Sequence, residues 1–325
     1  MRPLILIGLL VLVSLLAMLM AISIGSVELS PTLIWQVISG SSDEMSRYIV
    51  LELRLPRATN AFTTGALLAV AGSLMQVLLR NPLADPYILG VSGGASVAAL
   101  LAILLGISGW FLNLSAFAGA LLAILLVFGL ARGHGAWNPT RLLLTGVVLA
   151  SGWGAAITFI LTIAPSDSVH GMLFWLMGDL SYGGTPGYAL VVLILGLLAV
   201  LPLARAMNVL RFGELQAQAL GLDIRKLHIS LYLLASLFTA AAVIQAGSVG
   251  FIGLIVPHML RLSGLGDHRY LLPASVFGGG ALLLIADTLA RTLVAPQQLP
   301  VGVISAAIGV PLFLFLLYRG RLNRV

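Results

Sequence analysis

The stretch ISLYLLASLFTAAAVIQAGSVGFIGLIVPHMLRL, residues 229–262, decides how many times this chain can cross a membrane. It is long enough for one bent helix or for two shorter helices. Arg225 and Lys226 precede it, and Arg261 and Arg269 lie at or beyond its end. Because basic loop residues are retained in the cytoplasm, both ends belong on the same side, and the stretch is predicted to cross twice. The turn is expected at the sequence QAGSVG.

The composition of the whole chain indicates an integral membrane protein. Of its 325 residues, 60% are hydrophobic and 9% charged, and the mean hydropathy is +1.10. Soluble domains have roughly 45–50% apolar and about 25% charged residues. The net charge of +6 does not indicate nucleic-acid binding, because the basic residues lie singly between apolar segments. Without cysteine, the chain has no disulfide or thiolate site.

Segments of the length needed to span a bilayer, about 20 apolar residues, recur along the sequence. The first is predicted to be a retained helix, because its apolar run exceeds the roughly 7–15 residues of a signal peptide. The sequence therefore predicts an all-α membrane protein with a single domain, 1–325, of ten membrane-spanning helices. The predicted spans are 4–24, 58–79, 87–107, 111–131, 142–163, 187–204, 229–246, 249–262, 271–294 and 300–318.

The basic residues predict the orientation of this bundle. With ten crossings, only Arg47, Arg54, Arg57 and Arg291 fall on one side, and the other 13 of the 17 basic residues fall on the opposite side. The positive-inside rule then places both termini in the cytoplasm.

A polar loop at about 205–227 contains the stretch RFGELQAQALGLDIRKLH, residues 211–228, on the predicted cytoplasmic side. Glu214 suits the first turn of a short helix, Gly221 suits its C-terminal cap, and Asp223 can cap the next helix. Such a helix can rest on lipid headgroups or insert into a cleft of another protein. It lacks the basic face and aromatic anchor of an interfacial helix, which favours the protein cleft.

A second short helix is predicted on the outer side, at about 166–180. Ser166 or Ser168 is expected to cap it and Gly178 to end it. Its Phe174 and Trp175 suit an aromatic belt at the membrane surface.

The sequence contains little that could support catalysis. The only lysine, Lys226, has no phosphate-binding glycine frame before it, and the five histidines have no metal-ligand spacing. Asp287 is the clear candidate for an acid inside a span, and Arg291 lies four residues later. We interpret the two as an ion pair within one helix, while an ion-coupled secondary transporter that uses Asp287 is the alternative.

Several motifs resemble the permease family of bacterial ABC importers for iron siderophores, haem and vitamin B12. The match extends from about residue 50 to the C-terminus. It is carried by the runs LRLPRATNAFTTGALLAVAGSLMQVLLRNPLADPYILGVSGGASVAAL (53–100), NPTRLLLTGVVL (138–149), RFGELQAQALGL (211–222), GFIGLIVPHMLRLSGLGDHRYLLP (250–273) and ADTLARTLVAPQQLPVGVISAAIGVPLFLFLL (286–317).

The resemblance implies a homodimer in a bacterial inner membrane, with one cytoplasmic ATPase subunit under each copy. ATP and magnesium would be bound by the ATPase, and no cofactor by this chain. The residues that would couple the permease to the ATPase are Gly213, Glu214, Gln216, Ala217, Leu220 and Gly221.

The resemblance also implies a periplasmic or lipid-anchored substrate-binding protein that docks on the outer side. Arg54, Arg57 and Arg291 match the docking positions. Arginine suits this role because its planar fork can hold a carboxylate through two hydrogen bonds. The alternative for each is a membrane-surface anchor or an ion pair with Glu52 or Asp287.

In the family the fifth and tenth helices line a path along the dimer axis, so pore or gate candidates lie on the fifth span: Thr140, Thr145, Ser151 and Thr158. Residues 72–100 and 253–284 each give an apolar helix, a polar turn and a glycine-rich helix, which predicts two related halves. In the first of these, Asp85-Pro86 predicts a turn, and the glycines that follow permit close helix packing. The substrate could be a ferric siderophore, haem or cobalamin.

Overall fold

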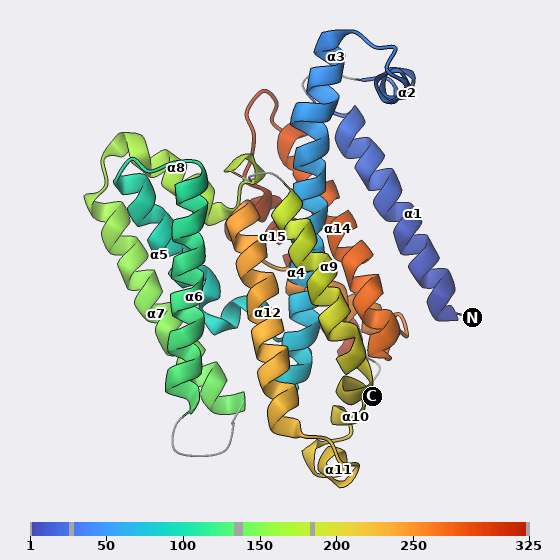
Figure 1. Cartoon of the computed structure of the whole chain (residues 1–325), viewed down its shortest axis with the longest axis vertical. Helices are drawn as coiled ribbons and strands as arrows, with labels where there is room; N and C mark the ends of the chain where they lie inside the picture. Colours follow the sequence, from blue (N-terminus) through green and yellow to red (C-terminus); the bar gives the residue numbers. More distant parts are fainter. Residues whose placement is uncertain (1, 26–28, 133–138, 183–185, 323–325) are drawn as a thin grey trace.

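The structure is a computed structural model that describes residues 2–25, 29–132, 139–182 and 186–322. Throughout these ranges the chain forms helices and connecting turns, without a β-strand, as Figure 1 shows. The predicted all-α class is confirmed. The helices are α1 (Arg2–Ser23), α2 (Pro31–Ser39), α3 (Glu44–Tyr48), η1 (Ile49–Arg54), α4 (Leu55–Leu78), η2 (Pro86–Leu89), α5 (Val91–Leu104), α6 (Trp110–Arg132), α7 (Pro139–Ile163), α8 (Ser166–Met177), η3 (Leu180–Tyr182), α9 (Gly187–Val200), η4 (Leu201–Leu203), α10 (Ala204–Leu210), α11 (Glu214–Ala219), α12 (Ile224–Ala246), α13 (Ile252–Leu262), α14 (His268–Thr292) and α15 (Val301–Leu322).

Each predicted span contains one apolar helix of this structure. Seven helical segments are long and apolar enough to cross a membrane, and α5, α13 and the apolar part of α15 are shorter. The stretch 229–262 divides as predicted, because α12 ends at Ala246 and α13 begins at Ile252. Gly247 in the turn between them has a positive φ of 66°, which a residue with a side chain rarely adopts.

The helix that contains the second predicted span, 58–79, extends well beyond it at the outer end. Helical structure runs without interruption over residues 44–78, through α3, η1 and α4. Asp43 starts it by accepting a hydrogen bond from the Ser46 backbone N–H at 3.0 Å. Pro56 lies just after the π-helix η1, where the Leu55 N–H bonds to the Val50 carbonyl and the α-helical hydrogen-bond pattern begins only with α4. The polar residues of this segment therefore do not end the helix, which projects upward in Figure 1.

Helix α4 is the centre of the molecule, with 94% of its apolar window buried. It packs against α12, α13 and α14. Gly72 makes this possible, because a Cβ atom there would lie 1.8 Å from the carbonyl oxygen of Gly253 in α13. The hydroxyls of Ser73 and Ser275 are 3.0 Å apart between α4 and α14. Small residues therefore bring the central helices into backbone contact.

Helices α5, α6 and α7 form a group at one side of this centre (Figure 1). A Cβ atom on Gly94 would lie 2.5 Å from the carbonyl oxygen of Gly119, so α5 and α6 also pack closely, as the glycines predicted. Only 11% of the apolar window of α7 is buried within the chain. Most of its surface is available to lipid or to another protein.

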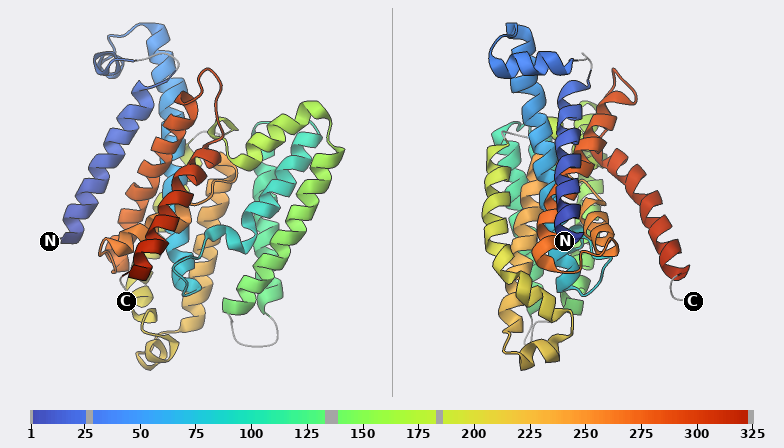
Figure 2. Two further views of the ribbon diagram at one scale, coloured as in Figure 1. Left: turned by 180° about the vertical axis from the view of Figure 1, so that it is seen from behind. Right: turned by 90° about the vertical axis from the view of Figure 1, so that its right-hand side faces the viewer.

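The two ends of the molecule carry different elements. Helix α11 lies at the lower end in Figure 1, and α2 and α3 lie at the upper end. In Figure 2 the first turn of α1 and the last turn of α15 both lie in the lower half of the molecule, toward the end that carries α11.

Candidate functional site

Helix α11 has the local structure that the loop sequence predicted. Gly213 precedes it with a φ of 116°, and Gly221 follows with a φ of 81°. Both values lie in the region that favours glycine. Asp223 then caps α12 by accepting a hydrogen bond from the Lys226 backbone N–H at 3.0 Å. Glycine and capping residues thus set the bounds of this short helix.

Three large apolar side chains on and beside α11 are exposed at the surface. Phe212, Leu215 and Leu220, here called the apolar tip, are exposed by 76%, 79% and 72%. Ala217, by contrast, is fully buried against the rest of the chain. Of the predicted coupling residues, Gln216 and Leu220 are therefore at the surface, while Ala217 secures α11 from beneath.

An ion pair ties α11 to the central helix. The Glu214 carboxylate pairs with the guanidinium of Arg80, just beyond the end of α4, and lies 3.9 Å from Nε2 of His228 in α12. Sequence reasoning missed Arg80 because the pair joins residues far apart in the chain. The pair connects the apolar tip to two apolar helices.

At the opposite end, the structure brings Arg54, Arg57 and Arg291 together at a cavity of about 650 Å³. Arg57 Nη2 lies 3.0 Å from Asp287 Oδ1, and Arg291 Nε lies 3.0 Å from Asp287 Oδ2. The Asp287 side chain is completely buried. The predicted pair of Asp287 and Arg291 is confirmed, and Arg57 joins it as a second cation.

The guanidinium groups of these arginines are bonded within the chain. Arg54 is almost fully buried, and its Nη1 donates to the carbonyl oxygens of Ile22 and Ser23 at 2.7 and 2.9 Å. Arg57 Nη1 also donates to the side chain of Gln298 at 3.1 Å. In the described part of the chain, no ion pair includes Glu52. The arginines therefore hold α1, α4 and α14 together, and docking stays a prediction.

The pore candidates divide between two faces of α7. In a helix of about 3.6 residues per turn, Thr140, Ser151 and Thr158 lie within roughly 20° of one another, and Thr145 lies about 140° away. The first three are exposed in the single chain, and Thr145 is half-buried. Ser151 and Thr158 donate to the Val147 and Gly154 carbonyls of their own helix at 3.1 and 2.9 Å. Their face is therefore smooth and only weakly polar.

Two expectations for the outer short helix are wrong. Helix α8 follows Pro165 without a side-chain cap, so neither Ser166 nor Ser168 caps it. Pro165 instead precedes the helix, and its ring restricts the backbone there without a hydrogen bond from a side-chain hydroxyl. Trp175 is buried, with 1% exposed, and cannot form an aromatic belt at the membrane surface. Gly178 does end the helix, with a φ of 84°.

Known proteins are similar to this chain in both sequence and fold. A family model described as the FecCD transport family matches residues 10–319. The hemin transport system permease protein HmuU of Yersinia pestis is 38% identical over 99% of this chain and 98% of its own length. The vitamin B12 import system permease protein BtuC of Escherichia coli O9:H4 (strain HS) is 40% identical over 84% of each chain.

Two solved structures are similar in fold. A structure described as an inward-facing conformation of a metal-chelate type ABC transporter superposes with a TM-score of 0.86 and 30% identity, over 98% of this chain and 99% of its own. PsaBC from Streptococcus pneumoniae, solved with a Fab, gives a TM-score of 0.51 at 18% identity, over 87% of this chain and 94% of its own, a likeness of fold alone.

Proposed function

The chain belongs to the FecCD transport family, and we propose that it is the membrane permease subunit of an importer that takes up a metal chelate or cobalamin with energy from ATP. The relatives that support this proposal are permeases for hemin and vitamin B12, matched over most of their length. The chain serves as a translocation subunit, and a partner chain hydrolyses ATP.

The proposed topology has ten crossings with both termini in the cytoplasm of a bacterial inner membrane. The seven long and three shorter apolar helices support the number of crossings. The concentration of basic residues at the end that carries α11 supports the orientation.

The proposed energy coupling rests on one observation, the exposure of the apolar tip at this basic end of the molecule. Three large apolar side chains, exposed by more than 70% each, surround a helix of six residues. Exposed apolar groups of this kind mark contacts with another protein or with a membrane. The short α11 has no basic face for lipid headgroups, which favours a protein. We propose that the tip inserts into a cytoplasmic ATPase subunit, which binds ATP and magnesium. The Glu214–Arg80 pair would transmit movement of the tip to α4.

Two further partners follow from the proposed function. A second copy of this chain would pack near α7, whose exposed face carries Ser151 and Thr158. A periplasmic or lipid-anchored binding protein would dock at the outer arginine cavity. Arg57 and Arg291 pair there with the buried Asp287. Arg54 and Glu52 also line the cavity, so the three arginines outnumber the two carboxylates.

The test is ATP-dependent uptake of hemin, cobalamin or a ferric siderophore by proteoliposomes that contain this chain, its ATPase and its binding protein. Leu215→Lys places a charge on the apolar tip without removing a buried group. We expect it to abolish uptake and retention of the ATPase on the purified permease. Met45→Lys is the matched control, since Met45 is 67% exposed at the other end, and it should retain the ATPase.

The same experiment distinguishes an ATP-driven importer from the alternative, an ion-coupled secondary transporter. Uptake by proteoliposomes that lack the ATPase, driven by an ion gradient, would contradict the proposal. Equal ATPase retention by Leu215→Lys and the native chain would show that the apolar tip is not the coupling surface.

A further inference from the structure

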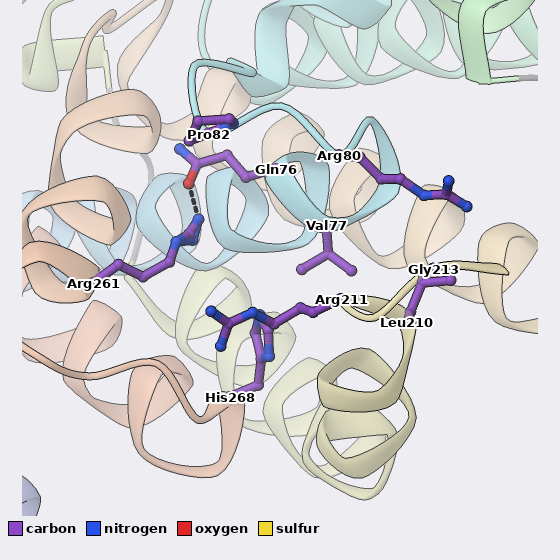
Figure 3. Close-up of a pocket in the computed structure, with 9 residues that line it drawn as sticks. All are labelled: Gln76, Val77, Arg80, Pro82, Leu210, Arg211, Gly213, Arg261 and His268. Carbon is purple, nitrogen blue, oxygen red and sulfur yellow. Dashed lines mark hydrogen bonds between the residues drawn. The ribbon is translucent and has the colours of Figure 1, made fainter. Parts of the chain in front are cut away.

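A second cavity lies beside α11, at the end of the molecule predicted to be cytoplasmic. Its volume is about 240 Å³. Its walls come from the ends of α4, α10 and α13, the start of α14 and the segment before α11, as Figure 3 shows. The residues that line it are Gln76, Val77, Arg80, Pro82, Leu210, Arg211, Gly213, Arg261 and His268.

The cavity is strongly basic. Arg80 is neutralised by Glu214, but within the described ranges no ion pair includes Arg211 or Arg261. Arg211 donates to the carbonyl oxygen of Gly266, and Arg261 donates to Oε1 of Gln76. Neutral oxygens satisfy only part of the five N–H groups that each guanidinium carries. Arg211 is exposed and Arg261 half-buried, and both line this one cavity without a carboxylate partner within the described ranges. Their like charges repel each other, and a bound anion would relieve that repulsion.

His268 adds an unpartnered polar atom to the same cavity. Its side chain is 1% exposed, and its Nδ1 lies 2.6 Å from Oδ1 of Asn208. That amide is oriented by its Nδ2, which donates to Asp267 at 2.7 Å. Since Oδ1 can only accept, Nδ1 carries the hydrogen. Nε2 is buried without a hydrogen-bond partner, in a residue that lines the cavity. A buried nitrogen in this state lacks a hydrogen-bonding group that a ligand could supply.

We propose that this cavity binds an anionic phosphate group. The forks of Arg211 and Arg261 match the anionic oxygens of phosphate, which arginine recognises through paired hydrogen bonds. Nε2 of His268 would accept a hydrogen bond from a hydroxyl of a phosphate monoester or of a headgroup. The phosphate can come from an acidic lipid of the cytoplasmic leaflet, since basic pockets between membrane helices bind such headgroups, or from a soluble phosphorylated compound.

The cavity lies next to α11, so an anion bound in it would affect how α11 is held. Gly213, which precedes α11, forms part of the wall, and Arg80 links the same region to Glu214. An anion bound there would neutralise the repulsion between Arg211 and Arg261 and hold α10, α13 and α14 together beneath the apolar tip. Binding at this cavity requires only this chain and does not depend on the ATPase.

The test uses the purified full chain in nanodiscs. In the first arm the nanodiscs contain only phosphatidylcholine, and inorganic phosphate is titrated against potassium chloride of equal ionic strength while the thermal unfolding midpoint is recorded. In the second arm they contain phosphatidylglycerol, and lipid retained by the protein is measured by native mass spectrometry. Stabilisation by phosphate assigns the site to a soluble anion, and retention of phosphatidylglycerol alone assigns it to a headgroup.

Variants connect either result to the cavity. Arg211→Gln is expected to weaken phosphate binding or lipid retention at least tenfold, because Arg211 is at the surface and its loss leaves the helices intact. Arg261→Lys keeps the charge near Gln76 but not the fork, and a loss of about threefold or more is expected. Arg205→Gln, an exposed charge on α10 outside the cavity, should change binding less than twofold.

The proposal is overturned if neither phosphate nor phosphatidylglycerol binds more strongly than the chloride and phosphatidylcholine controls. It is also overturned if Arg205→Gln weakens binding as much as Arg211→Gln does, because the effect would then come from the overall positive surface.

Discussion

Asp287 shows how a charge is held within an apolar helix bundle. Its carboxylate is completely buried and receives hydrogen bonds from Arg57 at 3.0 and 3.1 Å and from Arg291 at 3.0 Å. Arg291 also donates to the carbonyl of Ala21 in α1 at 3.1 Å. A buried ion pair of this kind need not stabilise the protein relative to apolar residues, but removing one partner leaves an unpaired buried charge.

Asp287→Asn is therefore expected to destabilise the protein by about 3–5 kcal/mol, the range measured when a buried pair loses one partner. The measurement is the thermal unfolding midpoint in detergent, with Asp223→Asn, which removes an exposed carboxylate, as the control. An unchanged midpoint with lost uptake would contradict the structural role and favour ion coupling through Asp287.

Asp85 gives a prediction on pH. Burial raises the pKa of its carboxyl from 3.8 to about 6, against the hydrogen bond that it accepts from the Tyr87 backbone N–H. Between these values the folded state binds more protons than the unfolded state, so stability should fall as pH rises from 4 to above 6. The full loss is at most about 3 kcal/mol.

Asp85→Asn keeps an acceptor for the Tyr87 N–H without the charge, and its stability should change little over this window. The unfolding midpoints of both proteins at pH 4.5 and 7.5 decide the matter. Equal pH dependence of the two would show that Asp85 is not the titrating group.

At the scale of elements, the position of each helix depends on the space left by small residues. Helix α4 meets α14 where a Cβ on Gly65 would lie 2.2 Å from the carbonyl of Gly279, and it meets α13 at Gly72 and Gly253. These contacts allow α4 to pack against both α13 and α14 at backbone distance. Arg80 lies just beyond the end of this central helix and pairs with Glu214, so the placement of α4 also sets the position of α11.

Gly72→Ala should destabilise the protein by roughly 1–3 kcal/mol, the usual effect of overfilling a packed interior, because α13 must move away. Gly129→Ala in α6 is the matched control, since a Cβ there would meet nothing within 4 Å. Alanine at that position should be neutral or slightly stabilising, by up to about 1 kcal/mol. The measurement is the unfolding midpoint of each variant, and similar midpoints would contradict the packing argument.

At the scale of the whole molecule, charge and shape give the two ends different roles. The end with α11 has the apolar tip and the basic cavity, and the other end has the outer arginine cavity and the projecting α3. The proposed orientation assigns the first end to the cytoplasm.

The lack of native cysteine makes this orientation directly measurable. Leu215→Cys and Met45→Cys each place one thiol at an exposed position, at opposite ends of the molecule. In intact spheroplasts a membrane-impermeant maleimide should label Met45→Cys, and it should label Leu215→Cys only after permeabilisation. The reverse pattern would invert the topology.

Local sequence accounts for much of what the structure contains. Hydrophobicity located the ten apolar helices, and glycine and aspartate located the turn after Ala246, the end at Gly221 and the cap at Asp223. Spacing of four residues predicted the pair of Asp287 and Arg291. Each of these features depends on residues within one or two turns of one another, so a single sequence determines it.

Only the tertiary structure decided which side chains meet across the bundle. It joined Arg57 to Asp287 and Arg80 to Glu214, buried Ala217 and gathered Arg211 and Arg261 around one cavity. The sequence also did not predict that the helix of the second span begins as early as Glu44, because helix continuation over residues 44–78 depends on capping and packing rather than on hydrophobicity. Contacts between distant segments depend on how helices pack in three dimensions, and no periodicity within one segment contains that information.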